Sequence, residues 1–349
     1  MKKIVIIISD ITKCAGTERV VSGLANYLVD NGFYVEIVSL FSSRGTSYFG
    51  LAPSIIVHHL AIGSYEAKSV VRKLYGLAIS LFQCYRYLRR TDNDILIGTS
   101  RNTNIIAWLS KKKRHVIGCE HFAANVPMNK IFKWFRNHIY QRLDRLVVLT
   151  RFDLAYYTQR GIKAVLIQNS ISIQGQQTDK KNIAIAIGRH SIEKNFKELI
   201  AIWHTISQIN PTWELQIIGD GLLAEENKQY AESLECKNIR FLPFQQDIAS
   251  YYSKASLYLM TSLYEALPMV LLEAQTCGCV CIAYDCDTGP RDIIENGKDG
   301  YIIPMGQRQK FVDKIQYLIS HPNIIKEMGV QARRSSEKYA PDRIMPQCI

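Results

Sequence analysis

The sequence predicts an α/β protein built from two Rossmann-like domains, each containing a doubly wound parallel sheet. Three observations support this prediction. Short runs rich in Ile and Val alternate with helical patterns along nearly the whole chain, which is typical of parallel βαβ units. The alternation forms two series separated by a polar stretch. The 349 residues exceed one typical domain, and a hydrophobic content of 47% is enough for two cores.

The first series of strands begins at the N-terminus. Its apolar run follows two lysines, as in a signal peptide, but Ser9 and Asp10 end it before the roughly 7–15 residues that a signal core needs. We therefore interpret residues 3–8 as a buried strand. A helix is expected over residues 18–30, before Gly32. Further strands are expected at residues 34–40, 55–60, 95–99, 115–119, 145–149 and 164–168.

The second series follows residues 174–181, a polar segment that we interpret as the interdomain linker. The predicted domains are therefore an N-terminal domain over residues 1–173 and a C-terminal domain over residues 182–349. Because ligands bind at the carboxyl ends of parallel strands, the site is expected in a cleft where two such domains face each other. Strands are expected at 183–187, 214–218, 239–242, 256–260 and 279–284, and helices near 194–209, 222–234, 247–254, 268–277 and 306–320.

The positive charge of the chain is confined to its N-terminal half. Residues 1–181 contain 26 Lys and Arg against 11 Asp and Glu, whereas residues 182–349 contain 17 against 20. A one-sided positive field favours an anionic partner such as a membrane surface, a phosphorylated substrate or a nucleic acid. A solvated surface that is merely rich in Lys would give the same count.

Composition and spacing argue against disulfides, metal sites and membrane spans. The nine cysteines are an odd number without framework spacing, which is typical of a reducing cytosol. Four of them overlap a predicted strand and are interpreted as buried structural residues rather than zinc ligands. The Asp-x-Asp triplets at 92–94 and 285–287 are interpreted as a turn and a loop, so no metal site is predicted. No stretch approaches the roughly 18 apolar residues that span a bilayer. The four cysteines are Cys277, Cys279, Cys281 and Cys286.

Residues 261–274, TSLYEALPMVLLEA, carry the strongest local signal. Pro268 and Gly278 fit the start and end of a helix, so Glu265 lies in the preceding loop and Glu273 inside the helix. The unpaired N–H groups of a helix start form a candidate phosphate site. Glu265 could accept hydrogen bonds from sugar hydroxyls, and Glu273 could reach a ribose. Two glutamates at this spacing are also common on an ordinary helix surface.

A second signal is residues 187–195, IGRHSIEKN, which follow the first strand of the second domain. Gly188 allows a tight turn at the carboxyl end of that strand. Arg189 and Lys194 could both point from this loop towards a diphosphate. Either cation alone would also be an ordinary surface charge.

Further motifs follow in order along the chain. They are GTER at 16–19, EH at 120–121, QNS at 168–170, IGDG at 218–221 and GPRDII at 289–294, with Gly297 and Gly300-Tyr301 after them. Together with residues 188–195 and 265–273, they make the sequence similar to family 4 glycosyltransferases of the GT-B fold. The resemblance covers nearly the whole chain.

The resemblance implies a retaining glycosyltransferase of the kind that builds bacterial O-antigen, capsule or exopolysaccharide. Its donor would be a nucleotide sugar, with a UDP-sugar expected from the frequency in the family. In front-face attack the departing diphosphate would help accept the acceptor proton. Fixed cations and helix N–H groups would stabilise that diphosphate, so neither a metal ion nor a cofactor is expected.

The implied site residues come from both domains. In the C-terminal domain, the resemblance places Arg189 and Lys194 on the donor diphosphate. It places Glu265 on the donor sugar, with Ala266 and Leu267 beside it, and Glu273 on the ribose. In the N-terminal domain, Gly16 would let its loop approach the phosphates and His121 would line the reacting centre. The family commonly has glycine where Ala15 and Ala266 stand, and the added methyl groups narrow the space beside the phosphates.

Two basic segments of the first domain suggest a membrane partner. Residues 68–90 carry six basic and no acidic residues beside an apolar stripe, which fits either a membrane interface or packing on a sheet. Residues 130–145 add five basic residues with several aromatic ones, and residues 111–114 add four more. We expect a peripheral enzyme that meets a lipid-linked saccharide acceptor on the anionic cytoplasmic face of the membrane. The stripe is Val71, Leu74, Ala78, Leu81, Tyr85 and Leu88.

Three other functions fit part of the pattern. A nucleic-acid-binding protein would explain the basic half, but no recognised reading module is present, so no nucleic-acid partner is expected. A nicotinamide dehydrogenase shares the fold, but only Gly16 follows the first strand where G-x-G-x-x-G would be needed. A nucleotide-sugar epimerase shares the fold and the donor site, and would differ by working without an acceptor.

Overall fold

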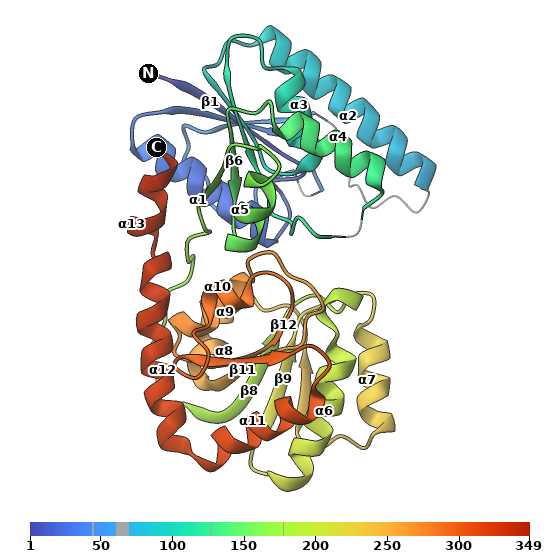
Figure 1. The fold of residues 1–349 in the computed structure, drawn as a ribbon, viewed down its shortest axis with the longest axis vertical. Coiled ribbons are helices and arrows are strands. Elements are labelled where there is room, and N and C mark those ends of the chain that lie inside the picture. Colours follow the sequence, from blue (N-terminus) through green and yellow to red (C-terminus); the bar gives the residue numbers. More distant parts are fainter. Residues whose placement is uncertain (44, 61–69, 127, 177) are drawn as a thin grey trace. The chain divides into compact units, whose positions relative to one another are not determined.

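The computed structural model describes the chain except residues 44, 61–69, 127 and 177. It divides into two compact units, which are residues 1–170 with 344–349 and residues 171–343. Each unit contains one sheet of parallel strands with helices on its faces (Figure 1). The predicted fold class, two Rossmann-like parallel-sheet domains, is confirmed.

The first sheet has seven strands in the order β3-β2-β1-β4-β5-β6-β7. Strand β1 is central and pairs with β2 on one side and with β4 on the other, where the order reverses. Such a reversal is the point where parallel sheets open a binding crevice. The strands are β1 (Lys3–Ile8), β2 (Tyr34–Ser39), β3 (Ile56–His59), β4 (Ile95–Gly98), β5 (His115–Cys119), β6 (Arg145–Val148) and β7 (Ala164–Leu166).

Both faces of the first sheet are covered by helices. Helix α1 (Gly16–Asp30) packs Val21, Ala25 and Leu28 against one face. The other four helices cover the opposite face, where the larger apolar cluster of this unit lies. They are α2 (Val70–Arg90), α3 (Arg101–Leu109), α4 (Lys130–Tyr140) and α5 (Arg151–Thr158).

The second sheet has six strands in the order β10-β9-β8-β11-β12-β13, with the reversal between β8 and β11. Its strands are β8 (Lys181–Ile187), β9 (Glu214–Ile218), β10 (Ile239–Leu242), β11 (Ala255–Met260), β12 (Val280–Asp285) and β13 (Gly300–Pro304). The main core lies between one face of this sheet and helices α6, α7, α11 and α12. The helices are α6 (Phe196–Ile209), α7 (Ala224–Ser233), α8 (Ile248–Lys254), α9 (Met269–Thr276), α10 (Pro290–Ile293), α11 (Arg308–Ser320) and α12 (Pro322–Ser336), with a 3₁₀ turn η1 (Ile192–Lys194) before α6.

Strand β13 and helix α12 are the longer of the elements near the C-terminus that were not predicted. Strand β13 is short and is bounded by Gly300 and Pro304, residue types that are depleted in strands. Helix α12 begins with Pro322 at its first turn and contains Gly329, which lowers its helix propensity. Both elements form because they complete the packing of the second unit, since β13 pairs with β12 and α12 contributes to the main core.

The observed units differ from the predicted domain bounds at both ends of the second domain. The residues before β8 do not form a detached linker, because Lys180 is bound within the second unit. After α12 the chain continues through η2 (Glu337–Tyr339) and α13 (Pro341–Ile344) into η3 (Met345–Cys348). Residues 344–349 belong to the first unit, where the buried Met345 side chain lies against Gly23.

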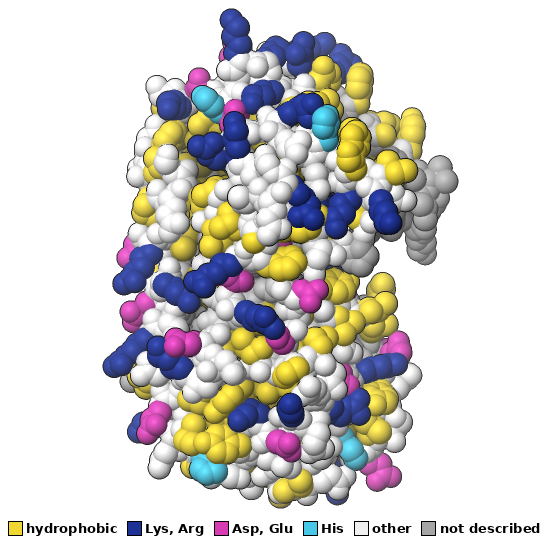
Figure 2. Space-filling model, viewed as in Figure 1, with side chains coloured by type: hydrophobic (Ala, Val, Ile, Leu, Met, Phe, Trp, Pro, Cys, Tyr) yellow, Lys and Arg dark blue, Asp and Glu magenta, His cyan; other side chains and the backbone are white. Residues whose placement is uncertain are grey.

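The structure reduces the basic surface expected from the sequence. Figure 2 shows Lys and Arg side chains spread over the first unit with few Asp and Glu on the same face. Two of the predicted surface cations, Arg114 and Arg136, are buried instead. Arg114 donates to the Leu88 carbonyl oxygen, and Lys111 pairs with Asp144 at 2.8 Å.

Only part of the predicted apolar stripe of α2 packs on the core. Leu81 and Leu88 lie against the first core, whereas Ala78 is exposed. Val71 and Leu74 belong to the stripe but their side chains lie outside the described part of the chain. Among the described helices, none is long and apolar enough to cross a membrane.

Candidate functional site

Two loops at the carboxyl edge of the second sheet form the candidate site. One follows β8 and contains residues 188–195, and the other follows β11 and contains residues 261–268. The strands β8 and β11 are neighbours at the reversal of the sheet order. The loops are tied together because the Leu263 N–H donates to the Glu193 carbonyl oxygen at 2.8 Å, and the Thr261 hydroxyl donates to the Asn195 carbonyl oxygen at 3.1 Å.

The central contact of the site is an ion pair between Lys194 and Glu265. Lys194 Nζ lies 2.6 Å from Glu265 Oε1, and the two side chains are only 19% and 13% exposed. Gly188 leaves the room for this arrangement, because a Cβ there would lie 3.1 Å from Lys194 Cε. The structure therefore brings together two residues that the sequence assigned to different parts of the donor.

Residues 288–289, directly before α10, contact the loop that carries Glu265 and fix its position. The Thr288 hydroxyl donates to the Glu265 carbonyl oxygen. Gly289 has φ +93°, and a Cβ at this position would overlap the Ala266 carbonyl oxygen and crowd Pro268. The GPRD motif thus shapes the loop that presents Glu265, a role that sequence reasoning did not assign to it.

The remaining basic residue of the β8 loop is exposed. The Arg189 guanidinium has no hydrogen-bond or ion-pair partner among the described residues. His190, beside it, is buried and its Nδ1 lies 2.9 Å from Asn227 Nδ2. Burial lowers the pKa of His190, so this imidazole is a neutral part of the loop scaffold. Arg189 and Lys194 thus remain the two cations that this loop presents.

The start of α9 provides the helix mouth that the sequence predicted. Pro268 is its N-cap residue, and no side chain caps the first turn. Leu267 is buried and Ala266 is partly exposed. Glu273 is 4% exposed, and its Oε2 accepts a hydrogen bond of 3.0 Å from the Tyr252 hydroxyl. Such a bond satisfies a buried carboxylate within the protein, and a contact of Glu273 with a ribose stays a prediction.

The predicted residues of the first unit lie at the carboxyl edge of its own sheet. Gly16 begins α1, and a Cβ built there would meet no atom within 4 Å. His121 follows β5 and lines an apolar cavity of about 320 Å³ together with Thr99 and Cys119. Burial lowers the pKa of His121 to about 4, so its imidazole is neutral at pH 7.

Glu120, next to His121, is the buried support of this edge. Its Oε2 accepts a hydrogen bond of 2.7 Å from the Tyr140 hydroxyl, while Asn104 Nδ2 donates to the same hydroxyl and to the Cys119 carbonyl oxygen. Burial raises the pKa of the Glu120 carboxyl. The sequence indicated the Glu120-His121 pair only through the family resemblance. The hydrogen-bond partners Asn104 and Tyr140 could not be predicted, because they lie on helices distant in the sequence.

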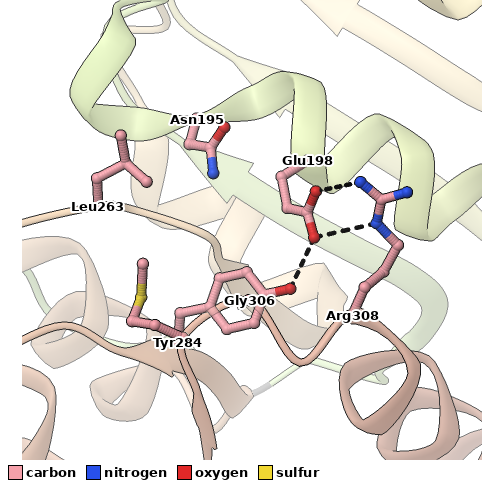
Figure 3. A pocket seen from close by; sticks show the side chains of 7 residues that line it. Asn195, Glu198, Leu263, Tyr284, Gly306 and Arg308 are labelled. Carbon is pink, nitrogen blue, oxygen red and sulfur yellow. Dashed lines mark hydrogen bonds and ion pairs between the residues drawn. The ribbon is translucent and has the colours of Figure 1, made fainter.

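A cavity of about 380 Å³ borders the loops of the second unit (Figure 3). Asn195 and Leu263 line it from the two loops, and Glu198 lies at its centre. Glu198 Oε1 accepts hydrogen bonds from Arg308 Nε at 3.1 Å and from the Tyr284 hydroxyl at 2.8 Å. The hydrogen bonds from Arg308 lower the pKa of the Glu198 carboxyl. The charged groups of this cavity therefore satisfy each other and hold the starts of α6 and α11 in place.

No three His, Cys, Asp or Glu side chains gather as a metal site among the residues that the structure describes. In the first Asp-x-Asp triplet, Asp94 accepts a hydrogen bond from the Lys3 N–H, and in the second, Asp285 pairs with Arg291. Cys277, Cys279, Cys281 and Cys286 are all buried. The prediction that these cysteines are buried is confirmed.

Family models match both halves of the chain. The model described as Glycosyltransferase Family 4 matches residues 15–174, and the model described as Glycosyl transferases group 1 matches residues 168–335. The two matches together cover every strand of the two sheets except β1, and all of the loops described above.

Curated relatives extend over most of the chain. The amylovoran biosynthesis glycosyltransferase AmsD of Erwinia amylovora is 29% identical, and the match covers 99% of this chain and 98% of the relative. An α-1,4-N-acetyl-D-galactosaminyltransferase of Campylobacter jejuni, whose name specifies a diNAcBac-PP-undecaprenol-linked substrate, is 26% identical over 97% and 95% of the two chains. A lipopolysaccharide 1,6-galactosyltransferase of Salmonella typhimurium is 30% identical over 67% and 68%.

Two solved structures have the same fold over their full lengths. TarM of S. aureus superposes with a TM-score of 0.84 at 15% identity and covers 100% of this chain and 98% of its own. HepE of Anabaena, solved in complex with UDP-glucose, superposes with a TM-score of 0.79 at 16% identity and covers 99% and 98%. At these identities the likeness concerns the fold.

Proposed function

The chain belongs to the glycosyltransferases and has their GT-B fold, and from this premise we propose that it moves a sugar from a UDP-sugar to a lipid-linked saccharide in bacterial polysaccharide synthesis. The observation that supports this best is the joining of Lys194, Glu265 and the exposed Arg189 on two loops at one sheet edge. Two cations beside a helix mouth suit a diphosphate, and a carboxylate suits the hydroxyls of a sugar.

In the proposed reaction the second unit binds the donor. Arg189 and Lys194 bind the diphosphate, Ala266 and Leu267 bring the backbone at the start of α9 near it, and Glu265 orients the sugar. Glu273 contacts the ribose in this proposal, for which the Tyr252 hydroxyl holds its carboxylate in one orientation. Because these cations and N–H groups stabilise the leaving diphosphate, transfer proceeds without a metal ion. The configuration is retained because the acceptor oxygen attacks the anomeric carbon on the face from which the diphosphate departs, and the departing diphosphate accepts the proton of the acceptor hydroxyl.

The first unit provides the acceptor side in this proposal. Gly16 begins a helix in open space, which leaves room for a phosphate or saccharide group. His121 is neutral at pH 7 and can exchange hydrogen bonds with the acceptor hydroxyl at the reacting centre. The excess of basic residues in this half and the lipid-linked substrate in the name of the Campylobacter jejuni relative support an acceptor at the anionic cytoplasmic surface of the membrane.

A panel of nucleotide sugars tests the donor assignment. We expect slow hydrolysis of one UDP-sugar without added metal, unchanged by EDTA, and faster release of UDP when a polyprenyl-diphosphate saccharide is added. NMR of the first product formed reports the anomeric configuration, and inversion would contradict the retaining mechanism. An epimerase would instead convert the sugar without any acceptor, and the absence of heat with every UDP- and GDP-sugar in calorimetry would contradict the donor site itself.

A further inference from the structure

Helix α4 exposes its apolar side chains instead of burying them. In its first six residues, Ile131, Phe132, Trp134 and Phe135 are 74%, 67%, 66% and 46% exposed. We refer to these four side chains as the α4 face. Soluble monomers rarely present contiguous large apolar groups of this kind, and such patches mark surfaces that bind a partner.

The residues through which α4 packs on the first unit explain why its apolar side chains face solvent. Its C-terminal half is anchored by the buried Ile139 and Tyr140. Arg136 is buried as well, with its guanidinium carbon 5.3 Å from the centre of the Tyr157 ring. Because the cation points inward and binds aromatic rings, the helix cannot turn its apolar side to the core without exposing this cluster.

The exposed side chains are held in place rather than left loose. Asn129 caps the helix by accepting a hydrogen bond of 2.9 Å from the Ile131 N–H. The ring of His138 stacks on Trp134 with 5.2 Å between the centroids and an interplanar angle of 11°. A fixed apolar surface loses less conformational entropy when it binds than a mobile one.

Helix α2 provides a comparison on the same side of the sheet. Its buried positions, including Ser80, Cys84 and Leu88, face the core. The α4 face has no such contact with the core, although α2, α3 and α4 cover the same face of the first sheet (Figure 1). Helix α2 also exposes Tyr75, Ile79 and Phe82, at 69%, 36% and 58%, but the α4 face is the denser of the two, with four such side chains within six residues.

The charges around the α4 face indicate an anionic partner. Lys130, at the start of α4, is exposed, and residues 1–181 carry 26 Lys and Arg against 11 Asp and Glu. Figure 2 shows hydrophobic side chains beside Lys and Arg side chains on the first unit. Aromatic and basic side chains together are the composition that binds at the headgroup level of a bilayer.

We propose that the α4 face inserts into the headgroup region of an anionic bilayer and so holds the first unit at the membrane surface. This inference rests on the proposed function, because it names the element through which the enzyme reaches a lipid-linked acceptor. Trp134 and the three neighbouring apolar side chains enter the interface, while Lys130 and other exposed basic side chains of the first unit bind lipid phosphates. Lipid phosphate is the common ligand, and the bilayer rather than free phosphate is its source.

Vesicles of phosphatidylcholine mixed with phosphatidylglycerol test the insertion directly. Of the four tryptophans, Trp134 is 66% exposed, Trp203 and Trp213 are buried, and Trp108 is partly buried against the first core. We expect brominated acyl chains to quench the fluorescence of the full-length protein, and Trp134→Phe to remove most of that quenching. The double variant Phe132→Ser/Phe135→Ser should bind these vesicles at least about tenfold more weakly, because two exposed aromatic rings no longer bury apolar surface in the bilayer. Free inorganic phosphate should not compete at concentrations that leave the vesicles intact.

A matched control is Leu222→Ser in the second unit, because Leu222 is 100% exposed and far along the chain from α4. This variant should bind vesicles as the unchanged protein does, and all variants should keep their affinity for UDP. Equal vesicle binding by the α4 double variant would overturn the inference. A dimer that the double variant converts to monomers, without quenching by brominated lipid, would also overturn it in favour of a second copy of the chain.

The same samples separate this inference from the proposed function. If quenching occurs but no UDP-sugar is consumed with any acceptor, the membrane insertion stands and the proposed transfer fails. If a water-soluble acceptor analogue is glycosylated equally by the double variant and by the unchanged protein, the transfer stands. Loss of activity confined to acceptors in vesicles is then the expected signature of the α4 face.

Discussion

At the residue scale, the site depends on one ion pair. The sequence predicted Lys194 and Glu265 as separate ligands of the phosphate and the sugar, because nothing in a single chain shows which distant residues meet. In the structure the two groups are 2.6 Å apart and largely withdrawn from solvent. If Lys194 binds the donor diphosphate as proposed, the phosphates compete with Glu265 for it, and this competition predicts opposite effects of the two residues on nucleotide binding.

Removing either partner of this pair should separate binding from turnover. Glu265→Ala should lower kcat by about a hundredfold or more, because the sugar loses a charged hydrogen-bond acceptor. Its affinity for UDP should stay equal or become tighter, since Lys194 is released for the phosphates. Lys194→Met should weaken UDP binding by about tenfold, which corresponds to roughly 1.4 kcal/mol. Calorimetry with UDP and steady-state kinetics measure the two effects, and unchanged turnover in Glu265→Ala would remove this residue from sugar binding.

A second residue-scale prediction concerns Gly289. The change Gly289→Ala places a methyl group against the Ala266 carbonyl and forces an L residue to φ +93°. We expect a loss of about 1–3 kcal/mol in unfolding free energy and weaker donor binding, because the Glu265 loop must move. The control is Gly297→Ala, where φ is +84° but a Cβ would meet no atom within 4 Å. Equal effects of the two substitutions in urea unfolding would mean that the close approach at Gly289 is unimportant.

The depressed pKa of His121 predicts a pH dependence of stability. Burial lowers this pKa to about 4, while an unfolded histidine has a pKa of about 6.5. Between these values the unfolded chain binds a proton that the folded protein does not, so the unfolding free energy falls as pH decreases, by at most about 1.4 kcal/mol per pH unit. Above pH 6.5 this contribution to the pH dependence vanishes. His121→Gln should flatten the slope between pH 4 and 6.5, whereas the exposed His59→Gln should leave it unchanged.

At the element scale, the sequence predicted elements that have a local pattern and missed contacts between residues that are distant in the chain. The strands around the candidate site were predicted to within two residues because parallel strands are continuous apolar runs. The start of α9 was predicted because Pro268 marks it. The polar segment 174–181 was interpreted as a linker, since its polarity gives no sign that Lys180 binds two helix ends. Contacts of this kind follow from tertiary structure and have no local pattern.

Lys180 therefore provides the prediction at this scale. Its Nζ donates to the carbonyl oxygens of Tyr252 and Ala255 at the end of α8, and of Cys277 at the end of α9, at 3.1, 2.6 and 2.7 Å. A cation at two helix C-terminal ends satisfies their unpaired carbonyls and opposes both dipoles. Lys180→Met should lower the unfolding free energy by about 2–3 kcal/mol. The neighbouring exposed Lys181→Met should change it little, and equal losses in chemical denaturation would contradict the capping role.

At the scale of the whole molecule, the sequence predicted the fold class and the uneven distribution of charge but not the exposure of individual groups. Two parallel sheets follow from alternating patterns that repeat over hundreds of residues. Whether a basic amphipathic helix turns its apolar side inward depends on the helices and strands packed beside it. The buried Arg114 and Arg136 illustrate this limit, because their sequence neighbours are exposed lysines or aromatic residues.

This distribution of charge leads to a prediction about salt. Residues 1–181 contain 26 basic and 11 acidic residues. The electrostatic field of this positive excess is screened beyond about 10 Å at 0.1 M salt and beyond about 3 Å at 1 M. Transfer to a lipid-linked acceptor in anionic vesicles should therefore decline steeply over this range. Transfer to a water-soluble analogue should decline much less, because the proposed diphosphate ligand Lys194 is only 19% exposed. Neutral phosphatidylcholine vesicles are the control and should show a weak dependence. If the three rates fall in parallel, the positive charge of the first unit does not guide the enzyme to the membrane. Salt-sensitive retention of the protein on DNA or RNA would then favour a nucleic-acid partner for the same charges.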